Sequence, residues 1–206
     1  MAHKVASVQT LYDDSMALYN DVVEGSGDYS AKTIIDDLAA GIANLKENWG
    51  GKDAGSQIQN VISVHNAMVG VRNALAALAN ESSKVAANYR EIQNSNGAGL
   101  EQISALTAET KTVMGDYSDD RDTIDIKPDV SSGQAKVNNA KTEMDLFIPK
   151  VRDAYNRIME NWTEGEESRN QAKEAFETFL TNVDTYKEVL AQASNSIDTA
   201  IKNYKM

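Results

Sequence analysis

The sequence predicts an all-α protein in which two long antiparallel helical hairpins are fused in one chain as an elongated four-helix bundle. Three observations predict this fold class. The 206 residues include only two prolines, Pro128 and Pro149, and good helix formers such as Ala, Lys, Glu and Gln are abundant. Apolar residues recur at three- and four-residue spacings along most of the chain. The order of motifs in the first half returns in the second half.

Composition and charge exclude several classes of function. Lys and Arg total 20 and Asp and Glu total 31, so the net charge is −11, and such an acidic chain is not expected to bind nucleic acid. The chain has no cysteine, which removes thiol nucleophiles and thiolate metal sites. The only histidines, His3 and His65, leave little for a zinc site or a histidine base. We therefore expect a protein that is not an enzyme and that carries no cofactor and no metal.

The first quarter of the chain is predicted to form two helices separated by Gly25. The second helix starts at a cap, Ser30, and ends at Trp49-Gly50-Gly51, where paired glycines permit a sharp reversal. The apolar positions of the two helices are Val5, Val8, Tyr12, Met16, Tyr19 and Val22, followed by Ile34, Ile35, Leu38, Ile42 and Leu45.

The next segment carries the clearest helical pattern in the sequence. If Val61 is heptad position a, only Ser82 is polar among ten successive a and d positions. Each large side chain on this seam contributes ~1.5–3 kcal/mol when it is fully buried, so the seam requires a partner helix. The preceding helix, folded back at Trp49, is the expected partner. The ten positions are Val61, Val64, Met68, Val71, Leu75, Leu78, Ser82, Val85, Tyr89 and Ile92.

Residues 97–132 are predicted to connect the two halves through a short helix and an acidic linker. The linker, residues 115–132, has alternating oxygen-bearing side chains that resemble a calcium loop. Arg121 and Lys127 replace the glycine and glutamate that such a loop requires, so we expect a solvated linker instead. The short helix would bury Leu100, Ile103, Leu106 and Val113, and the alternating oxygens belong to Asp116, Ser118, Asp120 and Asp122.

The second half repeats the first. A helix over 134–161 ends at Trp162, with Gly165 nearby, and a final helix follows. A shift of 113 residues places Trp49 on Trp162, and a shift of 115 aligns the later helices. The chain therefore divides into a first hairpin over 1–96, a connection over 97–132 and a second hairpin over 133–206. The aligned pairs of the later helices include Val61 with Phe176, Val64 with Phe179, Leu75 with Leu190, and Tyr89 with Tyr204.

Each half thus has a tryptophan and a nearby glycine between two long amphipathic helices, and this arrangement resembles the ESX/WXG family of type VII secretion in Gram-positive bacteria and mycobacteria. Trp49-Gly50-Gly51 fits the W-x-G turn of that family, whereas Trp162 and Gly165 have the spacing W-x-x-G. Family members are single hairpins that pair into four-helix bundles. The resemblance implies that two hairpins here form that bundle within one chain, as an internal pseudo-dimer and a monomer.

The resemblance also implies a non-enzymatic substrate or co-secretion partner, exported without a cleavable signal peptide, that contacts a protein partner or the secretion machinery. The family's export signal is Tyr-x-x-x-Asp/Glu, but Tyr89 is followed at the fourth place by Gln93. Two outcomes are therefore open: export with a partner that carries the signal, or a helper role inside the cell. The alternative is a cytosolic or surface helical adaptor or structural protein unrelated to secretion. No transmembrane segment is expected, because the apolar runs fall far short of ~20 residues.

Overall fold

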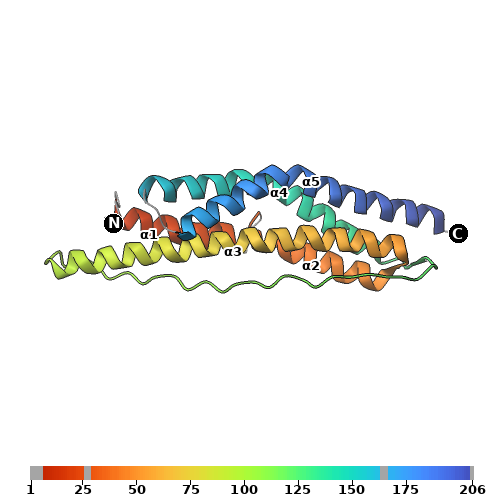
Figure 1. Cartoon of the computed structure of the whole chain (residues 1–206), viewed down its shortest axis with the longest axis horizontal. Helices are drawn as coiled ribbons and strands as arrows, with labels where there is room; N and C mark the ends of the chain where they lie inside the picture. The colour runs from red at the N-terminus through yellow and green to blue at the C-terminus, as the bar shows by residue number, and fades with distance from the viewer. Residues whose placement is uncertain (1–6, 26–28, 163–166, 205–206) are drawn as a thin grey trace.

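The computed structural model describes residues 7–25, 29–162 and 167–204. This part of the chain is mostly helical, so the predicted all-α class is confirmed. The helices lie along one long axis, and the helix of residues 52–95 runs for most of its length (Figure 1). In chain order the elements are α1 (Val8–Ala17), the π-helix η1 (Leu18–Val23), α2 (Ala31–Asn48), β1 (Trp49–Gly50), α3 (Lys52–Ser95), β2 (Asp125–Ile126), α4 (Val130–Asn161) and α5 (Glu167–Tyr204).

The first two helices begin at side-chain caps. The Ser7 hydroxyl accepts a hydrogen bond from the Thr10 N–H at the start of α1. Ser30 caps α2 as predicted, in a reciprocal pair with Thr33. The face predicted for the first helix is buried at Val8 and Val22 and was wrong by one residue between them. The buried positions there are Leu11, Ser15 and Leu18, whereas Tyr12, Met16 and Tyr19 are half-buried. Val5 lies outside the described residues. Tyrosines on the flank of a helix can bury the ring and keep the hydroxyl in water.

The heptad seam of α3 is buried over its first seven positions, from Val61 to Ser82. Beyond them Val85 and Tyr89 are half-buried and Ile92 is 56% exposed, so the seam ends before the helix does. The helix α3 packs against α1, α2 and α5, and α2 packs against α4. The long seam therefore faces several helices rather than one.

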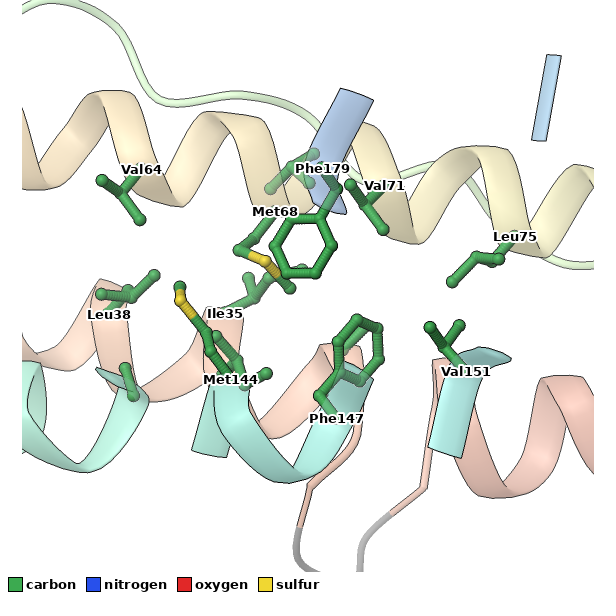
Figure 2. Packing of buried hydrophobic residues seen from close by; sticks show 14 of the residues in the cluster. Ile35, Leu38, Val64, Met68, Val71, Leu75, Met144, Phe147, Val151 and Phe179 are labelled. Atoms are coloured by element: carbon green, nitrogen blue, oxygen red, sulfur yellow. The ribbon is translucent and has the colours of Figure 1, made fainter. Parts of the chain in front are cut away.

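The core joins both halves of the chain. Figure 2 shows Phe147 of α4 and Phe179 of α5 between the apolar side chains of α2 and α3, among them Met68. The two phenylalanine rings meet edge to face with their centroids 5.9 Å apart. The helix α4 continues through Pro149 to Asn161 and begins at Val130, four residues before the predicted start.

The connection between the halves differs from the prediction. The expected short helix over Leu100 to Val113 is absent, and residues 98–124 form an extended segment, here called the strap. The strap runs back along α3 (Figure 1). Hydrogen bonds from its main chain to side chains of α3 hold this segment extended instead of helical. The predicted linker is also not merely solvated, because β2 pairs with β1 and α4 starts at Val130.

Helix α3 also meets the length and composition of a membrane span. Its most apolar window of 18 residues has a mean hydropathy of 1.2, and 61% of that window is buried inside the fold. Core helices of water-soluble proteins pass the same criterion. The absence of a transmembrane segment therefore stays a prediction.

Candidate functional site

Trp49 and Trp162 occupy equivalent positions at the ends of α2 and α4. The N–H of Trp49 donates to the Leu45 carbonyl, and the N–H of Trp162 donates to the Ile158 carbonyl at 2.9 Å. Both residues then leave the helix in an extended conformation, with φ and ψ of −140° and 118° at Trp49 and −129° and 99° at Trp162. The alignment made from sequence thus matches the local geometry.

Both tryptophan side chains are buried. Trp49 is 4% exposed and Trp162 is 0% exposed. The Trp162 indole Nε1 is buried without a hydrogen-bond partner in the described part of the chain. Trp49 contributes to the wall of a cleft of about 410 Å³ between the start of α3 and the last turns of α5. In this conformation neither indole is available as an exposed docking surface.

The strap closely approaches the glycines at and after the W-x-G turn. Gly51 has φ of 109°, which favours glycine, and a Cβ there would lie 2.9 Å from the Thr123 carbonyl oxygen. A Cβ at Gly50 would overlap the Arg121 guanidinium. A Cβ at Gly55 would lie 2.6 Å from the main-chain nitrogen of Asp119. The close approach of the strap thus explains the small residues at this turn.

Hydrogen bonds fasten the end of the strap to the first tryptophan turn. The Asp119 carboxylate accepts from the Gly51 N–H at 2.9 Å, and the Lys52 N–H donates to the Arg121 carbonyl at 3.1 Å. Trp49 pairs with Ile126 in the two-stranded β1–β2 ladder. We call residues 119–126 the clasp. It covers the W-x-G turn with another part of the same chain.

An ion pair stabilises the clasp. The Arg121 Nη2 lies 2.5 Å from Asp119 Oδ2, and the Asp119 side chain is 7% exposed. The hydrogen bond from Arg121, followed by the one from the Gly51 N–H, holds the pKa of Asp119 far below its ordinary value of 3.8. Asp119 is therefore ionised at neutral pH.

The other predicted site residues do not join this turn. Tyr89 is half-buried and Gln93 is exposed near the far end of α3, about 60 Å from Gly50 at 1.5 Å per residue. Trp162 also lies away from Trp49, because its neighbour Asn161 donates to Asp14 of α1. Gly165 lies outside the described residues. The predicted residues thus form separate surfaces rather than one site.

The acidic run that resembled a calcium loop is used in structural contacts. Asp116 accepts from Gln59 at 3.1 Å, and Asp122 pairs with Lys52 at 2.6 Å. Within the described residues, no group of three or more His, Asp or Glu side chains is placed to hold a metal ion. His65 is buried at 3% exposure, with Nδ1 3.0 Å from Asn66 Oδ1. His3 lies outside the described residues.

The polar face of α3 that holds the strap was not predicted from the sequence. Its side chains include Asn66 and Asn73, each of which bonds the N–H and the C=O of one strap residue. A signal was available, because amide side chains recur at seven-residue spacing on this helix. Comparison with protein families found no matching family, and comparisons with curated proteins and with solved structures found no match.

Proposed function

We propose that this protein is a non-enzymatic component of a type VII secretion system, a tandem protein of the ESX/WXG kind that is a secreted substrate or a co-secretion partner. In this proposal α2–α3 and α4–α5 are two fused hairpins that pair within one chain as a four-helix bundle. The observation that carries the proposal is the equivalence of Trp49 and Trp162. Each is the C-cap residue of a helix, donates its N–H to the carbonyl four residues earlier, and has an extended backbone.

The proposed mechanism is presentation of a rigid helical surface to a translocase or to a co-exported protein. The chain carries Gln93 where the family signal has an acid four residues after Tyr89. A glutamine keeps length and hydrogen bonding but carries no charge. The signal is therefore supplied by a partner, and the protein leaves the cell with that partner, without a cleavable signal peptide.

A second candidate is a cytoplasmic or surface adaptor or structural protein with no role in secretion. The burial of Trp49 and the clasp over its turn favour this candidate. A residue that another protein reads must be reachable, whereas a residue that only closes a core need not be. On this reading the tryptophans stabilise the ends of the helices and recognition lies elsewhere.

The experiment that separates the candidates is export in a strain with a controllable type VII ATPase. The proposal expects the protein in the culture medium only while the ATPase works, with a cytoplasmic protein as the lysis control. Appearance in the medium without the ATPase, or retention in the cell when all natural partners are present, contradicts the proposal.

A pair of variants tests whether the secretion machinery or a partner recognises the first tryptophan turn. Trp49→Phe is expected to block export or partner capture, and Trp162→Phe is expected to matter less, because only the first turn has the W-x-G spacing. Circular dichroism and urea unfolding of both variants control for folding, since both side chains are buried. Equal export defects, or no defect in either variant, would remove recognition of the first turn.

A further inference from the structure

The strap is held by a regular row of side chains on one face of α3. Four amide side chains, seven residues apart on the helix, each accept a hydrogen bond from a main-chain N–H of the strap, and the four strap residues are three apart. We call these four side chains the amide ladder. The pairs are Gln59 with Tyr117 at 2.7 Å, Asn66 with Met114 at 2.8 Å, Asn73 with Lys111 at 2.9 Å and Asn80 with Ala108 at 2.9 Å.

The regular register has a geometric cause. Seven residues of α-helix advance about 10.5 Å and return to nearly the same face. Three residues of an extended chain advance about 9–10 Å, and a three-residue repeat is the period of a polyproline II helix. One step along the ladder therefore matches one step along the strap. A surface with this repeat suits any polypeptide in the same extended conformation.

The ladder recognises main chain rather than side chains. The Nδ2 of Asn66 donates to the Met114 carbonyl at 2.9 Å, and the Nδ2 of Asn73 donates to the Lys111 carbonyl at 2.8 Å. Both asparagines thus bond the donor and the acceptor of one peptide residue. Met114 is half-buried, but the side chains between these two anchors, Thr112 and Val113, are exposed. Between Asn66 and Asn73, α3 therefore makes little contact with side chains of the strap.

Buried cationic and imidazole groups hold the two asparagines in orientation. Arg72 is 2% exposed, and its Nη1 donates to Asn73 Oδ1 at 3.0 Å. Arg72 also pairs with Glu24 at the end of η1. His65 Nδ1 lies 3.0 Å from Asn66 Oδ1, and this oxygen already accepts from the strap, so the imidazole nitrogen carries the proton. His65 and Arg72 of α3 thus contact both amide oxygens, and Arg72 also donates to the Glu109 carbonyl of the strap.

We propose that the amide ladder is a docking track for an extended polypeptide, and that segment 100–117 of a second copy of this chain binds it when the resident strap is released. The occupant is chosen because this segment is seated on the track in the structure, and the same main-chain groups are present in any copy. In the isolated chain its own strap outcompetes the segment of a second copy, because the covalent connection gives the strap an effective concentration on the order of millimolar.

The hinge of the strap allows release. Gly97 and Gly99 have φ of 88° and 60°, and a Cβ at either position would meet nothing within 4 Å. The turn is thus held by local backbone conformation and by Asn94, which bonds the N–H and C=O of Leu100. Beyond the turn, the buried Arg90 donates to the Glu101 carbonyl at 2.6 Å, so release at this end requires this hydrogen bond to break. The proposal does not depend on a role in secretion.

The test uses the full chain with Lys111→Pro and Met114→Pro, which removes two strap donors and leaves α3 unchanged. Thr110→Pro with Val113→Pro is the matched control, because in the described residues those N–H groups bond nothing. The probe is a fluorescent synthetic peptide of residues 98–118. The released variant is expected to bind it, and the natural chain and the control are expected to bind at least about tenfold more weakly.

Variant peptides and variant proteins test whether the track recognises the main chain or the side chains of the peptide. A peptide with prolines at the positions of Lys111 and Met114 should not bind, and a peptide with serine at the positions of Thr110, Thr112 and Val113 should bind as well as the natural one. Adding Asn66→Ala and Asn73→Ala to the released variant should abolish binding. A natural peptide that binds while the serine peptide does not would overturn main-chain recognition.

Folding is controlled by circular dichroism, and release by proteolysis of the strap. A folded, released variant that does not bind the natural peptide overturns the proposal. If the double-proline variant does not fold, Met114→Pro alone takes its place. Hydrogen exchange of the natural chain is a second measurement: the amides of Lys111 and Met114 should exchange more slowly than those of Thr110 and Val113. Equal rates would contradict the ladder.

Discussion

At the scale of single residues, Ser82 illustrates how a polar side chain is accommodated in an apolar seam. Its hydroxyl donates to the Leu78 carbonyl at 2.7 Å and lies 2.7 Å from the hydroxyl of Ser15 on α1. Both serines are 0% exposed, so the pair satisfies two groups that would otherwise be buried without partners. The interruption of the heptad pattern thereby sets the position of α1 along α3.

Asp119 gives a prediction on pH dependence. Its native pKa is lowered, so the ionised carboxylate stabilises the fold above the ordinary value of 3.8, and this stabilisation is lost as the pH falls from there toward the native pKa. Asp119→Asn should therefore lower the free energy of unfolding at pH 7, and its difference from the natural chain should shrink at pH 2.5. Urea unfolding at both pH values measures this difference.

Asp122→Asn is the control for this prediction, because Asp122 pairs with Lys52 on the exposed surface. It should have little effect at either pH. A difference between Asp119→Asn and the natural chain that is the same at both pH values would mean that the carboxylate charge does not hold the clasp.

The positions of the two tryptophans could be predicted from the sequence, but their burial could not. The two tryptophans at the helix ends were predictable, because each follows an amphipathic helix and precedes a break. Their burial was not, since the clasp that covers Trp49 comes from residues about 70 positions later in the chain. The amide at Asn66 recurs at Asn73 and Asn80, but a repeat of polar residues on a helix is usually a solvated face.

At the scale of elements, the helices with a strong apolar period were predicted, with the start of α4 four residues late, and the strap was missed. The start of α2 at Ser30 and its end at Trp49 follow from local cap chemistry. The strap has no such local signal, because its conformation depends on hydrogen bonds to α3 that the chain makes only after folding back. Tertiary contacts, not propensity, decide that segment.

Packing between elements gives a second prediction. Asp53 and Asn203 line one cleft, and Val71 and Phe179 line another. The helices α3 and α5 therefore run antiparallel, and Leu75 lies far from Leu190. Leu75→Ala and Leu190→Ala should each cost ~2–5 kcal/mol, since both side chains are 0% exposed. Their losses should add to within ~0.5 kcal/mol in urea unfolding.

The contrasting pair is Phe147 and Phe179, whose rings touch. A double-mutant cycle to leucine at these positions should give a coupling energy of ~0.5–1.5 kcal/mol. A coupling at Leu75 and Leu190 as large as that of the two phenylalanines would contradict the antiparallel register of α3 and α5.

At the scale of the whole molecule, the two halves bury each other. The helix α2 packs on α4 and α3 packs on α5, so the first half supplies the partner surfaces of the second. The large apolar side chains that remain exposed, such as Ile92, Val113 and Leu146, belong to different elements. Scattered exposed residues of this kind do not make an interface.

The expected state in solution is therefore a monomer. Light scattering of the isolated chain should give a mass near 22.4 kDa, with a strongly helical circular dichroism spectrum. A stable dimer that dissociates only on unfolding would contradict burial within one chain, and would indicate that the halves are exchanged between copies.

The strap has a consequence for the order in which the chain folds. Its bonds to α3 span sequence separations that grow step by step from the hinge: 6 residues at Leu100, 23 at Leu106, 38 at Lys111 and 58 at Tyr117. Each step closes only a small additional loop once the previous one has formed, so the entropic cost is spread along the segment. The strap can therefore form its hydrogen bonds to a folded α3 one after another, starting at the hinge. During synthesis the strap can close on α3 once residue 126 has left the ribosome, before α4 and α5 are available to pack there. The second half would then assemble on a surface that is already ordered.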